Sequence, residues 1–168
     1  RITGTRGATL IGAILIIIGH ICLSLPFAMV GLFTSMFFII VGSGLMKPNI
    51  SNIVGRLYPE NDVRMDAGFV IFYMSVNMGA LVSPIILQHY IDIRNFHGGF
   101  LIAAIGMALG LVWYLLFNRK TLGSIGMKPT NPLSSSEKKK YGTIIGIVVI
   151  AIILILMIAY FTPVSYTH

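Results

Sequence analysis

Residues 32–54 read LFTSMFFIIVGSGLMKPNISNIV, and this stretch decides the fold class. It exceeds the about 20 mostly apolar residues that a helix needs to cross the hydrocarbon core of a bilayer. It lacks the period-two alternation of a membrane strand, and only helices and closed barrels satisfy every backbone polar group in lipid. The stretch therefore predicts a transmembrane helix that carries one internal cation, Lys47.

Further apolar segments of similar length lie on both sides of this stretch. They predict four more spans, over residues 8–25, 67–91, 99–117 and 143–161. The predicted fold is therefore all-α and polytopic, with five membrane-spanning helices.

The predicted spans divide the chain into three parts. Residues 1–117 are expected to form a partial bundle of four spans. Residues 118–140 contain several Gly, Pro and Ser residues, which is typical of a flexible polar linker. Residues 141–168 are expected to form an additional, truncated transmembrane helix. Because the chain begins with Arg1 and ends without a polar tail, we expect it to be a piece of a larger membrane protein.

The composition excludes the common soluble classes. Of the 168 residues, 56% are hydrophobic and only 10% are charged, with a mean hydropathy of +0.89. Soluble domains carry about 25% charged residues. A soluble enzyme, a disordered tail and a disulfide-stapled module are therefore excluded. No nucleophile–base pair or metal-ligand set occurs within the predicted spans, so neither enzymatic activity nor a cofactor or metal site is predicted.

The charge distribution predicts the orientation of the chain in the membrane. The net charge is +7, without the basic patches interleaved with aromatic residues that would indicate nucleic-acid binding. One side of the predicted spans carries only Arg94. The other carries Arg1, Arg6, Arg56, Arg64, Arg119, Lys120, Lys128, Lys138, Lys139 and Lys140. Because cytoplasmic loops are enriched in Lys and Arg, loops 56–66 and 118–140 are predicted to be cytoplasmic.

Lys47 is the main exception to the apolar pattern. It lies nine residues before Arg56, or about 13 Å along a helix, which places its backbone near the midplane of the bilayer. A Lys there costs about 3 kcal/mol on insertion scales. Either the side chain extends toward the interface, or it faces a water-filled cavity. Gly42, Gly44 and Pro48 favour the second interpretation because they suit a kinked helix, although tight packing alone explains the glycines.

Asn77 is the second exception, eleven residues after Asp66 and again near the midplane. Its amide can donate to and accept from a substrate, or form a hydrogen bond between helices. Tyr73 lies one turn earlier on the same face. Gly79 permits close approach of another helix, and Pro84 is expected to bend the outer third of this helix.

Three short motifs resemble those of the proton-dependent oligopeptide transporter (POT/PTR) family. Residues 69–81, FVIFYMSVNMGAL, resemble its second signature. Residues 42–51, GSGLMKPNIS, resemble its fourth-helix motif, and residues 66–69, DAGF, are typical of the start of its fifth helix. Arg1, Gly4 and Arg6 look like the tail of the loop between its second and third helices.

The resemblance implies major-facilitator architecture, in which two six-helix bundles rock around a central site. This chain would supply helices three to six and the first helix of a hairpin between the bundles, or else the seventh core helix. The implied function is part of a proton-coupled di-/tripeptide symporter of the bacterial inner membrane. The implied partners are short peptides, protons, the lipid bilayer and the remainder of the transporter chain. No acidic residue lies in a predicted span, so proton-carrying carboxylates are expected elsewhere.

The resemblance also implies roles for individual residues. Lys47, Asn77 and Tyr73 would form the substrate and coupling site, with Lys47 pairing with a carboxylate of the peptide or of the other bundle. Arg6 and Asp66 would form a cytoplasmic gating or structural pair. Two alternatives stay open: a family relative that moves nitrate or an amino-acid-like solute, and a membrane scaffold subunit in which Lys47 reaches the interface.

Overall fold

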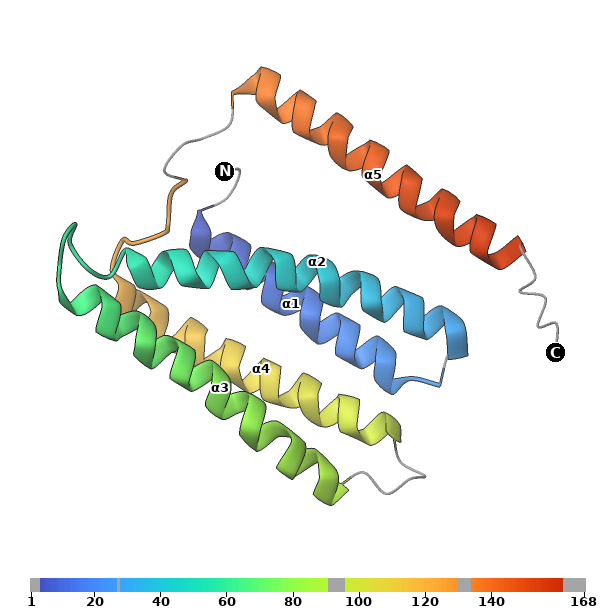
Figure 1. Cartoon of the computed structure of the whole chain (residues 1–168), viewed down its shortest axis with the longest axis horizontal. Coiled ribbons are helices and arrows are strands. Elements are labelled where there is room, and N and C mark those ends of the chain that lie inside the picture. The colour runs from blue at the N-terminus through green and yellow to red at the C-terminus, as the bar shows by residue number, and fades with distance from the viewer. Residues whose placement is uncertain (1–3, 27, 91–95, 130–133, 162–168) are drawn as a thin grey trace. The chain divides into compact units, whose positions relative to one another are not determined.

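The computed structural model of the chain describes residues 4–26, 28–90, 96–129 and 134–161. The elements, in order, are α1 (Thr5–Ser24), α2 (Ala28–Gly55), α3 (Arg64–Tyr90), α4 (Phe96–Leu122) and α5 (Ser135–Phe161), shown in Figure 1. The described residues contain no strand. The prediction of an all-α chain is therefore confirmed for this part of the sequence.

Four helices in the described part of the chain are long and apolar enough to cross a membrane. These segments are Thr5–Ser24, Met29–Gly55, Arg64–Gln88 and His97–Leu122. They overlap the first four predicted spans; residue 91, the end of the predicted third span, lies outside the described residues. The predicted fifth span lies on α5, where several residues fall outside the described side chains, and it stays a prediction.

The helices begin and end beyond most of the predicted span limits. Hydropathy marks the hydrocarbon core, whereas the helical hydrogen bonds continue into the polar interface. The first residues of the predicted linker thus belong to α4, and its last residues belong to α5. At the start of α5, the Ser134 backbone N–H donates to Glu137 Oε2 (2.9 Å) and the Glu137 N–H donates to Ser134 Oγ (3.3 Å). This reciprocal capping fixes the start of the helix well before its apolar run.

The chain divides into two compact units, one of residues 3–130 and one that contains α5. Within the first unit, α1 packs mainly against α2 and α4. The buried residues of α1 recur at helical spacing on one face: Thr9, Gly12, Ala13, Ile16 and Gly19. Small residues on this face let the backbones approach closely, which is how membrane helices associate without a hydrophobic driving force.

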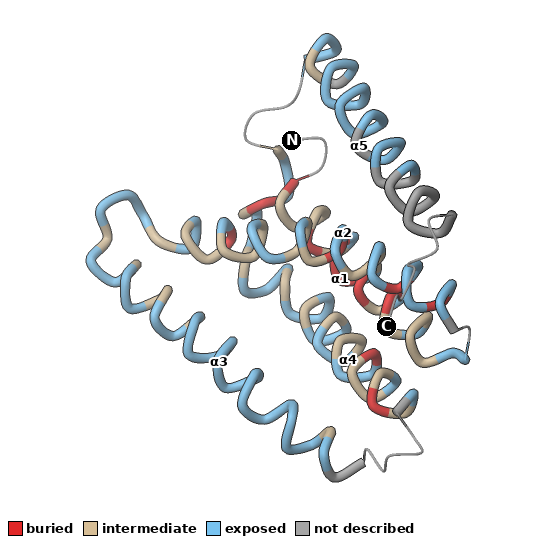
Figure 2. The backbone as a smooth tube through the Cα atoms, turned by 45° about the vertical axis from the view of Figure 1, so that its right-hand side comes forward, coloured by how far each residue is buried: buried red, intermediate tan, exposed pale blue. Residues whose placement is uncertain are grey.

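Helix α3 contrasts with α1, because none of its membrane-spanning window is buried within the described structure. Figure 2 shows it exposed along nearly its whole length. It contacts α2 close to the loop that joins them, where Tyr58 packs against Gly68 and the backbone of Gly55 lies near the Phe69 ring. From this contact the two helices diverge, as both Figure 1 and Figure 2 show.

Candidate functional site

The contact between α2 and α3 sets the depth of the candidate site. A methyl group on Gly55 would lie 3.5 Å from Phe69 Cζ, so the two helices meet there. Lys47 lies eight residues before Gly55, and Asn77 lies eight residues after Phe69. Each is therefore about 12 Å from the contact along its helix. Lys47 and Asn77 consequently lie at a similar depth on two diverging helices.

On each helix, one residue lies halfway between the candidate side chain and the α2–α3 contact, four residues from each. On α3, Tyr73 lies between Phe69 and Asn77, and the Phe69 and Tyr73 rings stack with centroids 6.4 Å apart. On α2, Ser51 lies between Lys47 and Gly55. Residues four apart share a helix face. Ser51 was not predicted from the sequence as a site residue, although its four-residue spacing from Lys47 was visible there.

Lys47 and Asn77 are both exposed, and neither side chain forms a hydrogen bond or ion pair within the described residues. Lys47 presents three N–H donors and a positive charge. Asn77 presents both a donor and an acceptor. A ligand with a carboxylate and an amide matches this combination of groups.

The backbone beside Lys47 is also unusual. Pro48 lies inside α2 and has no N–H, so it removes the helical partner of the Gly44 carbonyl. The next carbonyl, that of Leu45, accepts a hydrogen bond from Asn49 Nδ2 at 2.6 Å. Nothing in the described part of the chain lies within 4 Å of a methyl group placed on Gly44. This leaves polar backbone accessible one turn from the Lys47 side chain.

The other predicted packing and kink residues differ in their surroundings. Gly42 contacts Gly12 of α1 closely, in keeping with a packing role. A methyl group on Gly79 would meet nothing within 4 Å in the described residues, so its predicted packing partner is not among them. Pro84 lies inside α3, which continues through it, and the Ser83 hydroxyl donates to the Gly79 carbonyl at 2.7 Å.

Arg6 and Asp66 do not form an ion pair in this structure. Arg6 Nη2 donates to the Gly123 carbonyl at 2.8 Å, and the Arg6 backbone N–H donates to the Gly126 carbonyl at 3.2 Å. Arg6 therefore holds the start of α1 against the segment that follows α4. The pairing of Arg6 with Asp66 was predicted from their common level in the membrane. A common level does not determine which side chains meet.

The salt bridge of the α2–α3 loop joins Arg64 and Asp62 at 2.9 Å. The Arg64 guanidinium and backbone N–H both donate to the Asp62 carboxylate and thereby lower the pKa of that carboxyl below its usual value. The bonds lie at the exposed start of α3, so their role is to order the loop.

The described residues contain no group of three or more His, Cys, Asp or Glu side chains that could hold a metal ion. Among them, Cys22 is a free, half-buried cysteine. The chemistry available at the candidate site is therefore that of charge pairing and hydrogen bonding by Lys47, Asn77 and the nearby Tyr73.

Comparison with known proteins gives a consistent result. The family model described as "PTR2: POT family" matches residues 7–159. The chain is 42% identical, over 92% of its length, to a di-/tripeptide transporter from Lactococcus lactis subsp. lactis (strain IL1403). This match covers 31% of that relative.

Two solved structures are closely similar to the chain. A POT family transporter in complex with 5-aminolevulinic acid is 82% identical with a TM-score of 0.88, and the match covers 96% of this chain and 33% of that one. A POT family transporter in complex with a thioalcohol-conjugated peptide is 81% identical with a TM-score of 0.88 and the same coverage. The chain thus spans about one third of the length of the proteins it matches.

Proposed function

The chain belongs to the POT family, and from this membership we propose that it is part of a bacterial proton-coupled symporter that imports di- and tripeptides by alternating access. The observation that carries the proposal is the common depth of Lys47 and Asn77 on two diverging helices. The similarity to a di-/tripeptide transporter and to a transporter solved with a conjugated peptide supports it.

We assign α1–α4 to helices three to six of the amino-terminal bundle. Helix α5 is then a fifth span, the first helix of the hairpin between the bundles, with the seventh core helix as the alternative. The protein would lie in the bacterial inner membrane with loops 56–66 and 118–140 in the cytoplasm. The excess of basic residues in these segments supports this orientation.

In the proposed mechanism, Lys47 pairs with the substrate carboxylate or with a carboxylate of the other bundle. Breaking one pair and making the other favours the inward or the outward state, because a ligand shifts an equilibrium by its differential affinity for the two states. Asn77 would hydrogen-bond the peptide backbone, and Tyr73 would line the cavity beside it. Arg6 and Asp66 would form a cytoplasmic gating or structural pair in another state of the transporter.

The test uses the full-length transporter in proteoliposomes. Labelled dialanine uptake is followed with and without an inward proton gradient, for the wild type, Lys47→Ala and the loop control Lys128→Ala. We expect gradient-driven uptake that unlabelled dipeptides compete, its loss in Lys47→Ala, and its retention in Lys128→Ala. Correctly inserted wild type without gradient-dependent peptide uptake would overturn the peptide assignment.

One observation favours a second candidate function, the transport of an amino-acid-like solute. The 82% identical transporter was solved with 5-aminolevulinic acid. This compound carries an amino group and a carboxylate at opposite ends of a short chain, as a dipeptide does, so the same cation and amide could bind it. The same assay with labelled 5-aminolevulinic acid decides between the two: uptake of this solute without uptake of dialanine selects the second function.

A further inference from the structure

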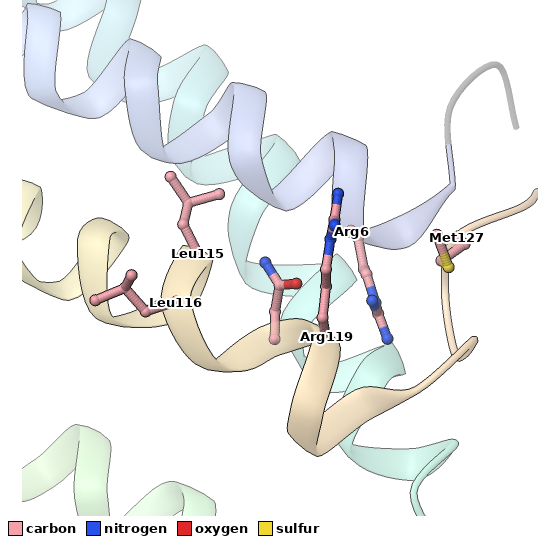
Figure 3. A pocket seen from close by; sticks show the side chains of 6 residues that line it. Arg6, Leu115, Leu116, Arg119 and Met127 are labelled. Carbon is pink, nitrogen blue, oxygen red and sulfur yellow. The ribbon is translucent and has the colours of Figure 1, made fainter.

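A cavity of about 580 Å³ lies between the start of α1 and the end of α4. It is separate from the candidate site on α2 and α3. Its lining, shown in Figure 3, consists of Arg6, Leu115, Leu116, Asn118, Arg119 and Met127. The cavity therefore combines two arginines and one amide with three apolar side chains.

The polar half of the cavity is positively charged, and none of its described lining residues is acidic. Figure 3 shows the Arg6 side chain coming from α1 and the Arg119 side chain coming from α4, and both line the cavity. Arg6 Nη2 is held by the Gly123 carbonyl, whereas Arg6 Nε is buried without a partner in the described part of the chain. Planar guanidinium groups with free N–H donors are suited to bind phosphate oxygens.

The apolar half of the cavity is exposed in the described structure. Leu115 and Leu116 are 47% and 69% exposed. In the same part of α4, the exposed Trp113 ring lies 4.6 Å from the Phe117 ring, centroid to centroid. Aromatic residues at the end of a membrane helix are typical of the headgroup region. The cavity thus lies where lipid headgroups meet acyl chains.

We propose that this cavity binds an anionic phospholipid of the cytoplasmic leaflet, with the phosphate between Arg6 and Arg119 and an acyl chain along Leu115 and Leu116. An anionic head and an apolar tail match both halves of the cavity. A free phosphate would leave the apolar half unused. The proposal rests on the proposed membrane orientation and is independent of which solute the transporter moves.

The binding test uses the full-length transporter in neutral detergent. Its thermal unfolding midpoint is measured with added phosphatidylglycerol, phosphatidylcholine or inorganic phosphate. We expect phosphatidylglycerol to raise the midpoint of the wild type and the other two additives to leave it unchanged. A shift with inorganic phosphate alone, or an equal shift with phosphatidylcholine, would overturn the proposal.

Matched variants locate the binding site. Arg119→Gln should weaken the apparent affinity for phosphatidylglycerol about tenfold, a change typical for loss of one charge-assisted pair. Lys120→Gln is the control, because Lys120 is the neighbouring exposed cation of the same last turn but does not line the cavity. Equal affinity of the wild type and Arg119→Gln would contradict the proposal, as would a midpoint lowered by Arg119→Gln equally with and without lipid.

A second variant keeps the test decisive if Arg119→Gln does not fold. Arg119→Lys retains the charge but loses the planar, two-pronged donor set. We expect native mass spectrometry to show fewer phosphatidylglycerol molecules retained by Arg119→Lys than by the wild type. The same number retained by both proteins would overturn the proposal.

Discussion

Gly12 of α1 and Gly42 of α2 lie so close together that a methyl group on either would be 2.7 Å from the carbonyl oxygen of the other. At this distance no side chain fits unless the helices separate. The contact anchors α2 five residues before Lys47. The position of the candidate binding cation therefore depends on two glycines that belong to different helices.

Replacing Gly42 by Leu should destabilise the bundle by about 1–3 kcal/mol, the usual effect of overpacking. The measurement is the thermal unfolding midpoint of the full-length transporter in detergent. Gly110→Leu is the control, because a methyl group on Gly110 would meet nothing within 4 Å in the described structure. Equal midpoints for Gly42→Leu and Gly110→Leu would show that the close contact does not support the fold.

Asn77→Ala should raise the KM for dialanine about tenfold, because it removes the proposed hydrogen bond to the peptide backbone. Ser75→Ala is a matched control on the same helix, since the Ser75 hydroxyl already donates to the Ile71 carbonyl at 2.9 Å. We expect Ser75→Ala to transport with the wild-type KM. If the two variants have the same KM, Asn77 has no role in binding the peptide.

The depth of Lys47 and Asn77 was predictable from the sequence, because counting residues from the charged loop gives position along a helix. That their helices meet at Gly55 and Phe69 and then diverge was not predictable, since it depends on packing between distant side chains. The same reason explains why the hydrogen-bond partners of Arg6 were not predicted. Its charge and level were readable, but its hydrogen bonds to Gly123 and Gly126 join residues far apart in the chain.

The start of α5 was missed for a different reason. The Ser-rich segment before it was interpreted as flexible linker, yet Ser134 and Glu137 have the three-residue spacing of a capping box. That signal was present in the sequence, whereas the linker was predicted from composition alone. Local hydrogen bonds at a helix end therefore deserve the same weight as apolar length in locating the ends of membrane helices.

Ser134→Ala should weaken the first turn of α5 by about 1 kcal/mol, the typical effect of losing a side-chain cap. Amide hydrogen exchange of that turn in the full-length transporter should become about fivefold faster. Ser135→Ala serves as the control, because none of the described capping bonds involves its hydroxyl. Unchanged exchange in Ser134→Ala would contradict the capping role.

The Arg64–Asp62 bonds predict a pH dependence of the α2–α3 loop. Because the pKa of Asp62 is lowered in the folded protein, its contribution to loop order is present above the unfolded pKa and is lost as the pH falls through the folded pKa. Arg64→Gln should raise the Asp62 pKa toward its ordinary value, since the guanidinium is its largest stabilising contact. Carboxyl carbon NMR of labelled, full-length transporter in micelles measures this pKa directly. Lys128→Gln, which removes a cation outside this loop, should leave the pKa unchanged. If Arg64→Gln leaves it equally unchanged, the guanidinium bonds to Asp62 do not persist in solution.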